Sequence, residues 1–231
     1  MDDLTLLYIS ASRMPEKWVK YQTSELLKVV KDTPIISVTQ KPLDLGLNLL
    51  DTEPISYWNI YMQMLRAAKL AKTPYVAMVE DDTLYSRKHF TQFRPPKDKV
   101  SYNCSRWSLF SWRTHPNIIY CLRQNISNCS LIAPTELLIE ALTERHEKHP
   151  NGVANHLGVG EIGRGRIERR LRVTRRGRVD WYSTVPIIQL NHRTGTDIGG
   201  GPGRIKKHGQ IKAIDIPYWG KAEDIVNEYH R

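Results

Sequence analysis

The sequence predicts an α/β protein built on a mostly parallel, Rossmann-like central sheet, with a smaller part of mixed or antiparallel strands. Two observations predict this fold class. Up to about residue 80, three apolar segments that suit buried strands alternate with two segments of helical periodicity, which is the order of a βαβαβ unit. Beyond residue 86 the apolar segments are short and closely spaced, as in antiparallel sheets. No internal repeat or clear linker interrupts the 231 residues, so we expect a single domain over residues 1–231.

The first two strands and the helix between them follow from apolar runs and one helix-start signal. Residues 4–10 are almost entirely apolar and predict a buried strand, and residues 34–39 predict a second one. Between them, Pro15 and Glu16 open a helix that runs to about Val30, because proline suits the first turn of a helix.

The second helix and the third strand complete the unit. Glu53 and Pro54 begin a predicted helix that extends to about Lys72, with apolar residues at helical spacing. Residues 75–79 then form a short apolar run that suits a strand covered on both faces.

The rest of the chain predicts shorter elements. A good helix is expected from Pro134 to about His149, with Thr135 as its cap, and another at the C-terminus. Short strands are expected at residues 100–102, 107–112, 118–121, 179–182 and 187–190.

Three consecutive acidic residues, Glu80, Asp81 and Asp82, follow the third predicted strand. Their carboxylates repel one another, and ligands of open α/β sheets bind just beyond the carboxyl ends of the strands. Carboxylate oxygens are hard ligands that suit magnesium, calcium or manganese. The triplet therefore predicts a divalent-cation site, with a solvated acidic turn as the plain alternative.

Composition sets the broad class. The apolar fraction of 40% and the charged fraction of 25% are ordinary for a globular protein, and no apolar run approaches the ~18–20 residues of a membrane span. The acidic N-terminus does not resemble a secretory signal. Cys104, Cys121 and Cys129 form no CxxC pair, which argues against structural zinc or a disulfide scaffold and favours a reducing, cytoplasmic setting.

The net charge of +10 is concentrated in one segment, residues 164–178. That segment holds eight arginines and a single acid, Glu168, so it carries +7 by itself. Guanidinium groups match phosphate geometry, and we expect a polyanionic partner such as a nucleic-acid backbone. A solvated helix face with surface ion pairs is the alternative. The arginines are Arg164, Arg166, Arg169, Arg170, Arg172, Arg175, Arg176 and Arg178.

The first part of the chain lacks both common phosphate loops, G-x-G-x-x-G after the first strand and G-x-x-x-x-G-K-[ST]. Its arrangement instead resembles the GT-A fold of family-2-like, nucleotide-sugar-dependent glycosyltransferases, which carry an acidic motif after a βαβαβ unit. Glu80-Asp81-Asp82 is similar to the "EDD" form of that motif, with residues 37–42 and 106–110 as further support. The resemblance runs from Leu4 to about His192. It divides the chain into a nucleotide-binding half (1–85), an acceptor-side half (86–194), and a Gly-rich loop with the C-terminal helix (195–231).

The resemblance implies roles for individual residues. Asp82 would be the principal ligand of Mn²⁺ or Mg²⁺, helped by Asp81, and His192 would be a third ligand, although a lone histidine is as often structural. The metal would bridge the diphosphate of a UDP-sugar and stabilise the leaving group. The donor would contact Ser10, Ser12, Arg13, Thr39, Lys41, Glu80 and Asp81.

An inverting enzyme also needs a carboxylate base for the acceptor hydroxyl. Glu161, an acid among glycines, is the first candidate and Asp180 is the second, and both have surface ion pairing as an equal alternative. A retaining enzyme needs no such base, and the sequence leaves the stereochemistry open.

The arginines favour DNA as the acceptor. Some bacteriophage enzymes glycosylate 5-hydroxymethylcytosine or 5-hydroxymethyluracil in DNA, and this chain resembles that functional group, which would place it in the host cytoplasm. Trp107, Trp112, Trp181 and Tyr182 would then help to hold a flipped base, with core packing as the default. Open alternatives are a surface-glycan acceptor, a non-enzymatic nucleic-acid-binding protein with a structural cation site, and a nucleotidyltransferase.

The segment Gly195–Gly203 is expected to be a loop, because it contains five glycines and a proline. It is interpreted either as a lid over the diphosphate or as a plain linker. As a lid, it would be followed by phosphate partners at Arg204, Lys206, Lys207 and His208.

Overall fold

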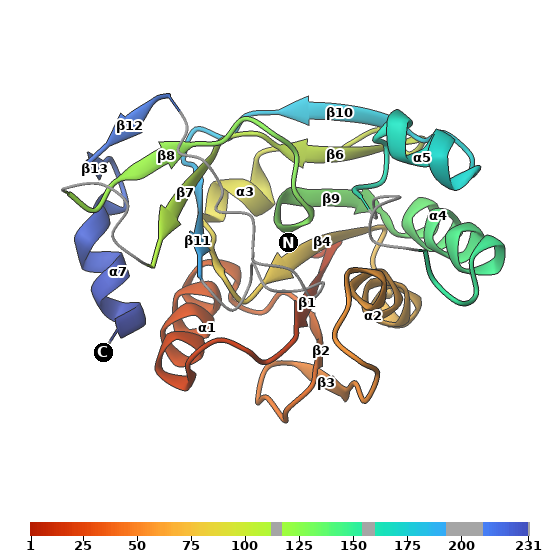
Figure 1. The fold of residues 1–231 in the computed structure, drawn as a ribbon, viewed down its shortest axis with the longest axis horizontal. Coiled ribbons are helices and arrows are strands. Elements are labelled where there is room, and N and C mark those ends of the chain that lie inside the picture. Colours follow the sequence, from red (N-terminus) through yellow and green to blue (C-terminus); the bar gives the residue numbers. More distant parts are fainter. Residues whose placement is uncertain (112–116, 154–159, 193–209, 231) are drawn as a thin grey trace.

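The structure is a computed structural model, and it describes residues 1–111, 117–153, 160–192 and 210–230. Its first part is the predicted βαβαβ unit, in which parallel strands alternate with helices (Figure 1). The elements are β1 (Leu4–Ser10), α1 (Glu16–Val30), β2 (Ile35–Thr39), β3 (Leu47–Leu50), α2 (Tyr57–Leu70) and β4 (Tyr75–Glu80). The α/β fold class is confirmed.

The main sheet has seven strands in the order β10-β6-β9-β4-β1-β2-β3. Its second part consists of β6 (Lys99–Asn103), β9 (Leu131–Pro134) and β10 (Gly177–Trp181). β9 runs antiparallel to both β4 and β6, and β6 is parallel to β10. Consequently β6 and β10 point the same way as β1, β2 and β4, and the carboxyl ends of all five strands lie at one edge.

A smaller, mostly antiparallel sheet stands beside the first, in the order β12-β8-β7-β11-β5. β5 follows β4 after only two residues, so the two sheets meet at the acidic turn. The strands are β5 (Thr83–Leu84), β7 (Arg106–Phe110), β8 (Tyr120–Leu122), β11 (Ile187–Asn191) and β12 (Lys212–Ala213). The predicted smaller mixed part is therefore confirmed.

The other elements are short, apart from two helices. They are α3 (Arg87–Thr91), the 3₁₀ turn η1 (Asn128–Ser130), α4 (Thr135–Lys148), α5 (Gly165–Leu171), the pair β13 (Asp215–Ile216) and β14 (Gly220–Lys221), and α7 (Ala222–His230). The helix α7 packs against α1 and the small sheet, and Trp219 Nε1 donates a hydrogen bond to Pro186 O at 2.9 Å.

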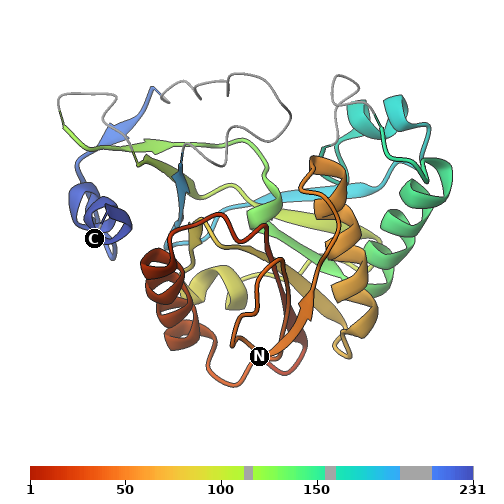
Figure 2. The same ribbon diagram turned by 60° about the horizontal axis from the view of Figure 1, so that its bottom comes forward.

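Helices cover the main sheet on both faces. Figure 2 shows α2 and α4 side by side on one face and α1 on the other side of the strands. Met64 of α2 and Leu142 of α4 are fully buried against Leu7 and Met78, whereas Leu26 of α1 packs against the opposite face. Burial on both faces explains why the strands read as continuous apolar runs.

Two local predictions were wrong, and one edge strand was missed. Helix α2 begins at Tyr57 and not near Glu53, because Ser56 Oγ caps it by accepting from Asn59 N at 3.0 Å. Thr135 does not cap α4. Pro134 is the N-cap, and Thr135 Oγ1 donates to Thr73 O at 2.7 Å. Strand β3 was not predicted, since Leu47 and Leu50 are about half exposed.

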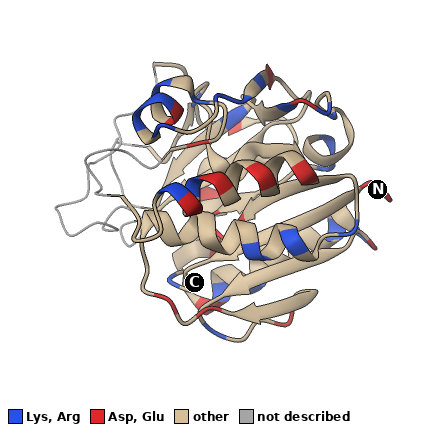
Figure 3. Ribbon diagram, turned by 90° about the vertical axis from the view of Figure 1, so that its right-hand side faces the viewer, with Lys and Arg blue, Asp and Glu red and all other residues tan. Residues whose placement is uncertain are grey.

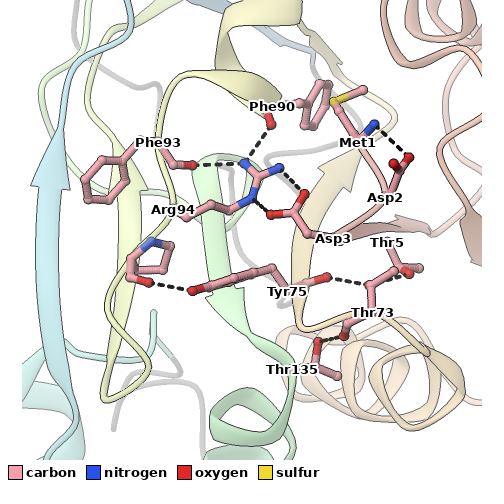
Figure 4. Close-up of polar contacts among 11 residues, drawn as sticks. Met1, Asp2, Asp3, Thr5, Thr73, Tyr75, Phe90, Phe93, Arg94 and Thr135 are labelled. Atoms are coloured by element: carbon pink, nitrogen blue, oxygen red, sulfur yellow. Dashed lines mark hydrogen bonds and ion pairs between the residues drawn. The ribbon is translucent and has the colours of Figure 1, made fainter.

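The amino edge of the sheet is closed by internal polar contacts (Figure 4). Arg94 holds the Asp3 carboxylate through two hydrogen bonds of 2.8 and 3.0 Å, and these lower the pKa of Asp3. Thr73 Oγ1 donates to Tyr75 O, so the hydroxyl of Thr5 is the donor in its 2.7 Å contact with Thr73. The acid at this edge therefore already has a cationic partner.

Two further observations concern the chain as a whole. Within the described residues, no helix is both long enough and apolar enough to cross a membrane. Cys104, Cys121 and Cys129 are buried, and none of them forms a disulfide.

Candidate functional site

The acidic turn lies at the carboxyl edge of the main sheet, as predicted. Glu80 ends β4, and it is in register with Ile9 of the neighbouring strand β1. Ser10, the last residue of β1, is in register with Thr39, the last residue of β2. The ends of three parallel strands thus bring Ser10, Thr39 and the acidic turn together at one edge.

Neighbouring elements hold the turn from two sides. Ser10 Oγ donates a hydrogen bond to Asp81 Oδ2, and Trp18 Nε1 of α1 donates to the backbone oxygen of Asp81 at 2.8 Å. On the other side, Leu190 N of β11 donates to the backbone oxygen of Asp82 at 2.7 Å, and Thr83 Oγ1 donates to Asp82 Oδ1 at 2.7 Å. These contacts fix both the backbone and the carboxylates before any ligand arrives.

The carboxylates of the turn are held close together at an electrostatic cost. Burial, followed by the charge of Asp82, raises the pKa of Asp81 to about 7, although the hydrogen bond from Ser10 acts in the opposite direction. A carboxyl group with this pKa is about half protonated at neutral pH. A cation at the turn would remove the penalty, because it favours the charged form of both carboxylates.

The ligand set predicted for a metal is only partly assembled. Among the described residues, no group of three or more His, Cys, Asp and Glu side chains could hold a metal ion, so His192 does not complete such a group with Asp81 and Asp82. His192 is 7% exposed, and its ring centroid lies 6.5 Å from that of Tyr229. Two adjacent carboxylates nevertheless fit a magnesium-type ion, which commonly takes one or two carboxylates, substrate phosphates and water.

The small polar residues beside the turn hold two loops together. Ser12, whose φ of 52° lies in the left-handed region, accepts hydrogen bonds from the backbone nitrogens of Gln40 and Lys41 at 3.1 Å each. The hydroxyl of Thr39 donates to Lys41 O at 2.7 Å and is buried. Ser12 and Thr39 therefore shape the loops. The Lys41 side chain is exposed and Arg13 is half-buried at the same edge.

Glu161, the first candidate base, lies within electrostatic reach of the same tyrosine as Glu80. Burial raises the pKa of Tyr61 to about 12, and the charges of Glu161 and Glu80 both add to this increase. Glu161 Oε2 pairs with Arg164 Nε at 3.1 Å. Buried Arg145 donates to Gly160 O at 2.8 Å and fixes the backbone just before Glu161.

Asp180, the second candidate base, lies on β10 at the border of the main sheet. It forms an ion pair with Arg178 at 2.8 Å, and its side chain is 37% exposed. Five strands separate β10 from β3 in the sheet order, and two of them, β6 and β9, separate it from β4.

The arginine-rich segment forms α5 and the chain that leads into β10. Figure 3 shows the acidic residues along α4 beside it. Arg176 pairs with Glu140 at 2.9 Å and with Glu144 at 3.1 Å, both on α4. Together with the pairs of Arg164 and Arg178, this shows that acids outside the segment neutralise part of its charge.

The single acid inside the segment has a different task. Glu168 is 1% exposed, and its Oε1 accepts from the backbone nitrogens of Gly163 at 2.7 Å and Arg176 at 3.3 Å. It organises the loop and does not neutralise a guanidinium. The exposed arginines are Arg166, Arg169, Arg170, Arg172, Arg175 and Arg178.

The aromatic residues predicted to hold a flipped base differ in their burial. Trp181 is buried and stacks on Phe93 with centroids 5.4 Å apart, so it belongs to the core. Trp107 is partly buried in the small sheet, and Tyr182 is 58% exposed at the end of β10. Trp112, the segment Gly195–Gly203 and the basic residues 204–208 lie outside the described residues.

Sequence reasoning missed two residues, Gln189, which contacts the turn, and Arg106, which contacts Gln189. Gln189 is a buried polar side chain in the middle of β11, and Arg106 is a buried cation at the start of β7. Gln189 Nε2 lies 3.2 Å from Asp82 Oδ2, and Arg106 Nη1 lies 2.6 Å from Gln189 Oε1. A glutamine inside the apolar run Ile187-Ile188-Gln189-Leu190 was the available signal.

A scan against protein-family models finds no match to this chain, and a search of curated proteins finds none either. Solved structures with a similar arrangement include the glycosyltransferase GlyE of Streptococcus pneumoniae TIGR4, at 9% identity and a TM-score of 0.45. The likeness covers 78% of this chain but only 45% of GlyE, so this chain spans less than half of that protein.

Two others cover more of their own length. A Drosophila β-1,4-galactosyltransferase 7 variant, in complex with manganese, UDP-Gal and xylobiose, has 11% identity and a TM-score of 0.45, over 85% of this chain and 75% of that one. A glycosyltransferase involved in glycosylation of the major capsid of PBCV-1 has 10% identity and a TM-score of 0.46, over 80% and 91%. At this level of likeness, function has to be argued from the residues of this chain.

Proposed function

We propose that the protein is a metal-dependent glycosyltransferase that moves a sugar from a UDP-sugar to an acceptor hydroxyl. The observation that carries this proposal is the acidic turn Glu80-Asp81-Asp82 at the carboxyl edge of a βαβαβ unit. Its carboxylates are held in place by neighbouring strands, and burial together with mutual repulsion raises the pKa of Asp81 to about 7. A site of this kind favours a cation and, through it, a diphosphate.

The donor would lie across the ends of β1, β2 and β4. Asp81 and Asp82 would hold Mn²⁺ or Mg²⁺, which supplies charge stabilisation to the diphosphate leaving group. The loops that Ser12 joins would border the nucleoside, with Arg13 and Lys41 as the cationic side chains at that edge. His192 remains a candidate only as a ligand that approaches when the metal and donor bind.

The acceptor would be activated by Glu161. In an inverting reaction its carboxylate accepts the proton of the acceptor hydroxyl as the new glycosidic bond forms. The support for this role is geometric: Arg145 donates to Gly160 O at 2.8 Å and lies over the Tyr61 ring at 5.1 Å, so the chain at Glu161 is held beside α2. Asp180 is the second candidate. A retaining enzyme would use neither acid as a base.

The favoured acceptor is 5-hydroxymethylcytosine or 5-hydroxymethyluracil in DNA, as in bacteriophage DNA modification in the host cytoplasm. The support is the set of exposed arginines on and after α5, which suits a phosphate backbone. A glycan acceptor is the second candidate, and the pairing of Arg176 with two acids of α4 favours it, because this pairing removes charge from the basic surface.

The test is an incubation with manganese, a panel of UDP-sugars, and hydroxymethylated or unmodified DNA, followed by nucleoside mass spectrometry. A hexose added only to hydroxymethylated DNA supports the full proposal. Hydrolysis of a UDP-sugar without transfer to DNA supports the enzyme and moves the acceptor to a glycan. No hydrolysis or transfer with any donor overturns the glycosyltransferase. Transfer of a nucleotide in place of a sugar identifies a nucleotidyltransferase.

A further inference from the structure

The buried side chain of Gln189 connects the acidic turn to a cation that does not touch it. Gln189 is 5% exposed and lies opposite Thr83 in the antiparallel pair β11–β5. Its Nε2 is 3.2 Å from Asp82 Oδ2 and 3.5 Å from Glu80 Oε2. One amide therefore contacts two of the three carboxylates of the turn.

The orientation of this amide is fixed by Arg106. Arg106 is 6% exposed, and its Nη1 lies 2.6 Å from Gln189 Oε1. Arginine has no acceptor, so the atom that faces it must be the amide oxygen. The NH₂ group of Gln189 is consequently turned towards Asp82 and Glu80 and cannot exchange places with the oxygen.

Arg106 itself is held by parts of the fold that lie away from the turn. Arg106 Nη2 donates to Asn125 O at 3.0 Å, and Arg106 N–H and C=O groups lie in β7, which is parallel to β11. Arg106 is in register with Ile187, two residues before Gln189. Both ends of the contact thus come from rigid strands of the small sheet.

We propose that Gln189, oriented by Arg106, is a positioning residue for the metal site. It occupies one lone pair of Asp82 Oδ2 and keeps the carboxylate in one rotamer, and Thr83 Oγ1 does the same for Oδ1 at 2.7 Å. The remaining lone pairs of Asp82 then point in fixed directions towards a cation. Hydrogen-bond partners of metal ligands usually contribute in this way to metal affinity.

This inference rests on the proposed function, because it assumes that Asp82 binds a divalent metal. It adds that the small sheet, and not only the βαβαβ unit, sets the affinity for the metal. Loss of the amide should weaken metal binding and leave the chemistry at saturating metal nearly unchanged, since Gln189 does not touch the reacting atoms in this scheme.

The test compares two buried glutamines that both donate to a carboxylate. Gln189→Met removes the contact with Asp82. Gln63→Met removes the 2.6 Å hydrogen bond from Gln63 to Asp51, a buried acid at the end of β3 outside the acidic turn. Methionine has nearly the same length and no amide, so the two variants lose comparable interactions, and thermal unfolding shows whether both remain folded.

The readout is Mn²⁺ affinity by calorimetry, with and without UDP, together with KM for Mn²⁺ and kcat. Gln189→Met should bind Mn²⁺ about ten- to a hundredfold more weakly, with kcat at saturating Mn²⁺ changed less than about threefold, whereas Gln63→Met should keep wild-type affinity. Arg106→Met should weaken binding in the same direction, and Arg106→Lys, which restores a donor to Gln189 Oε1, should recover part of it.

Each outcome bears on one proposal or the other. Equal Mn²⁺ affinity in Gln189→Met and wild type, or an equal loss in Gln63→Met, overturns the positioning role and leaves the proposed function untouched. Mn²⁺ binding that depends on Gln189 in a protein that transfers no sugar supports the positioning role and overturns the proposed function. A wild-type protein that does not bind Mn²⁺ overturns the metal site and, with it, both.

Discussion

The acidic turn and the arginine-rich segment are the two concentrations of charge in this chain, and the fold treats them differently. Asp81 and Asp82 are contacted by hydroxyl, amide and indole donors, and they are fixed by strands and a helix. The arginines of residues 164–178 lie on α5, on the segment after it and at the start of β10. Three of them, Arg164, Arg176 and Arg178, already form ion pairs with acids of α4 or of the adjoining residues of this chain.

This difference in partners indicates which of the two charged regions has a charge left for a ligand to neutralise. Fixed carboxylates that meet neutral donors keep their mutual repulsion until one of them is protonated or a cation binds. Surface arginines paired with glutamates lose part of their field, and such pairs contribute little to stability. The acid at the amino edge makes the same point, because Asp3 is held by Arg94 and needs no further cation. The acidic turn is thus the stronger indication of function.

The largest effect is expected when the acidic turn loses its principal carboxylate. Asp82→Asn should lower UDP-sugar hydrolysis and transfer with Mn²⁺ by about a thousandfold or more, because stabilisation of the leaving group is worth several kcal/mol. The apo protein should remain folded, since one of two repelling charges is removed. Activity is measured as UDP release at saturating Mn²⁺. Arg176→Ala is the control from the other region, and an equal loss of activity there would contradict the comparison.

Glu161 tests whether the segment before the arginines belongs to the reaction centre. Glu161→Gln should lower kcat by about a hundredfold or more through loss of the general base, while Mn²⁺ and UDP affinities stay unchanged. The matched control is Asp180→Asn, on the border strand, with an expected change below about threefold. If Asp180→Asn shows the greater loss, the two candidates exchange roles.

The exposed arginines should affect DNA affinity and leave metal binding intact. Replacing Arg166, Arg169 and Arg172 together by alanine should reduce the slope of log K against log salt by about 0.9 for each lost phosphate contact. Arg176→Ala should change this slope little, because its guanidinium is engaged by Glu140 and Glu144. Filter binding to duplex DNA at several salt concentrations measures the effect. If none of these variants changes the slope, the arginine-rich segment does not bind DNA.

The smallest effect is expected from pH on the unliganded protein. The pKa of Asp81 is raised from 3.8 to about 7 in the folded state, so between these values the folded state binds more protons than the unfolded state. Stability contributed by this group is therefore full below about pH 4 and falls as the pH rises towards 7, and the partial exposure of Asp81 to solvent reduces the size of this change.

The corresponding measurement is thermal unfolding without metal at several pH values, with Asp81→Asn as the control that should lose this dependence. Mn²⁺ affinity should rise over the same range, because the metal binds the deprotonated carboxylate. A wild-type protein whose pH profile equals that of Asp81→Asn would show that the turn carries no stored repulsion.

Local signals predicted the βαβαβ unit well. The apolar runs at β1 and β4 and the proline before α1 placed these elements within about a residue of their observed bounds. Strand β3 escaped prediction because it is an edge strand with Leu47 and Leu50 exposed, and an apolar pair at a solvated edge has no periodic signal.

The sequence predicted the acids of the candidate site but not the residues that contact them. Three adjacent acids can be recognised in a sequence, but their partners come from far along the chain, such as Gln189 and Trp18. The partners of the arginines were also non-local: Glu140 and Glu144 precede Arg176 by more than thirty residues. The net charge summed over residues 164–178 alone is therefore larger than the charge that remains after pairing with acids elsewhere in the chain.

The pairing of β5 with β11 determines when, during synthesis on the ribosome, the contacts of the acidic turn can form. The turn that follows β4 is synthesised early, yet the backbone of Asp82 is held by Leu190, which emerges much later. The βαβαβ unit accordingly does not hold the acidic turn by itself. A nascent chain that has just completed β4 carries the acids without Leu190 and Gln189, so the acidic turn is fully held only after β11 has been made.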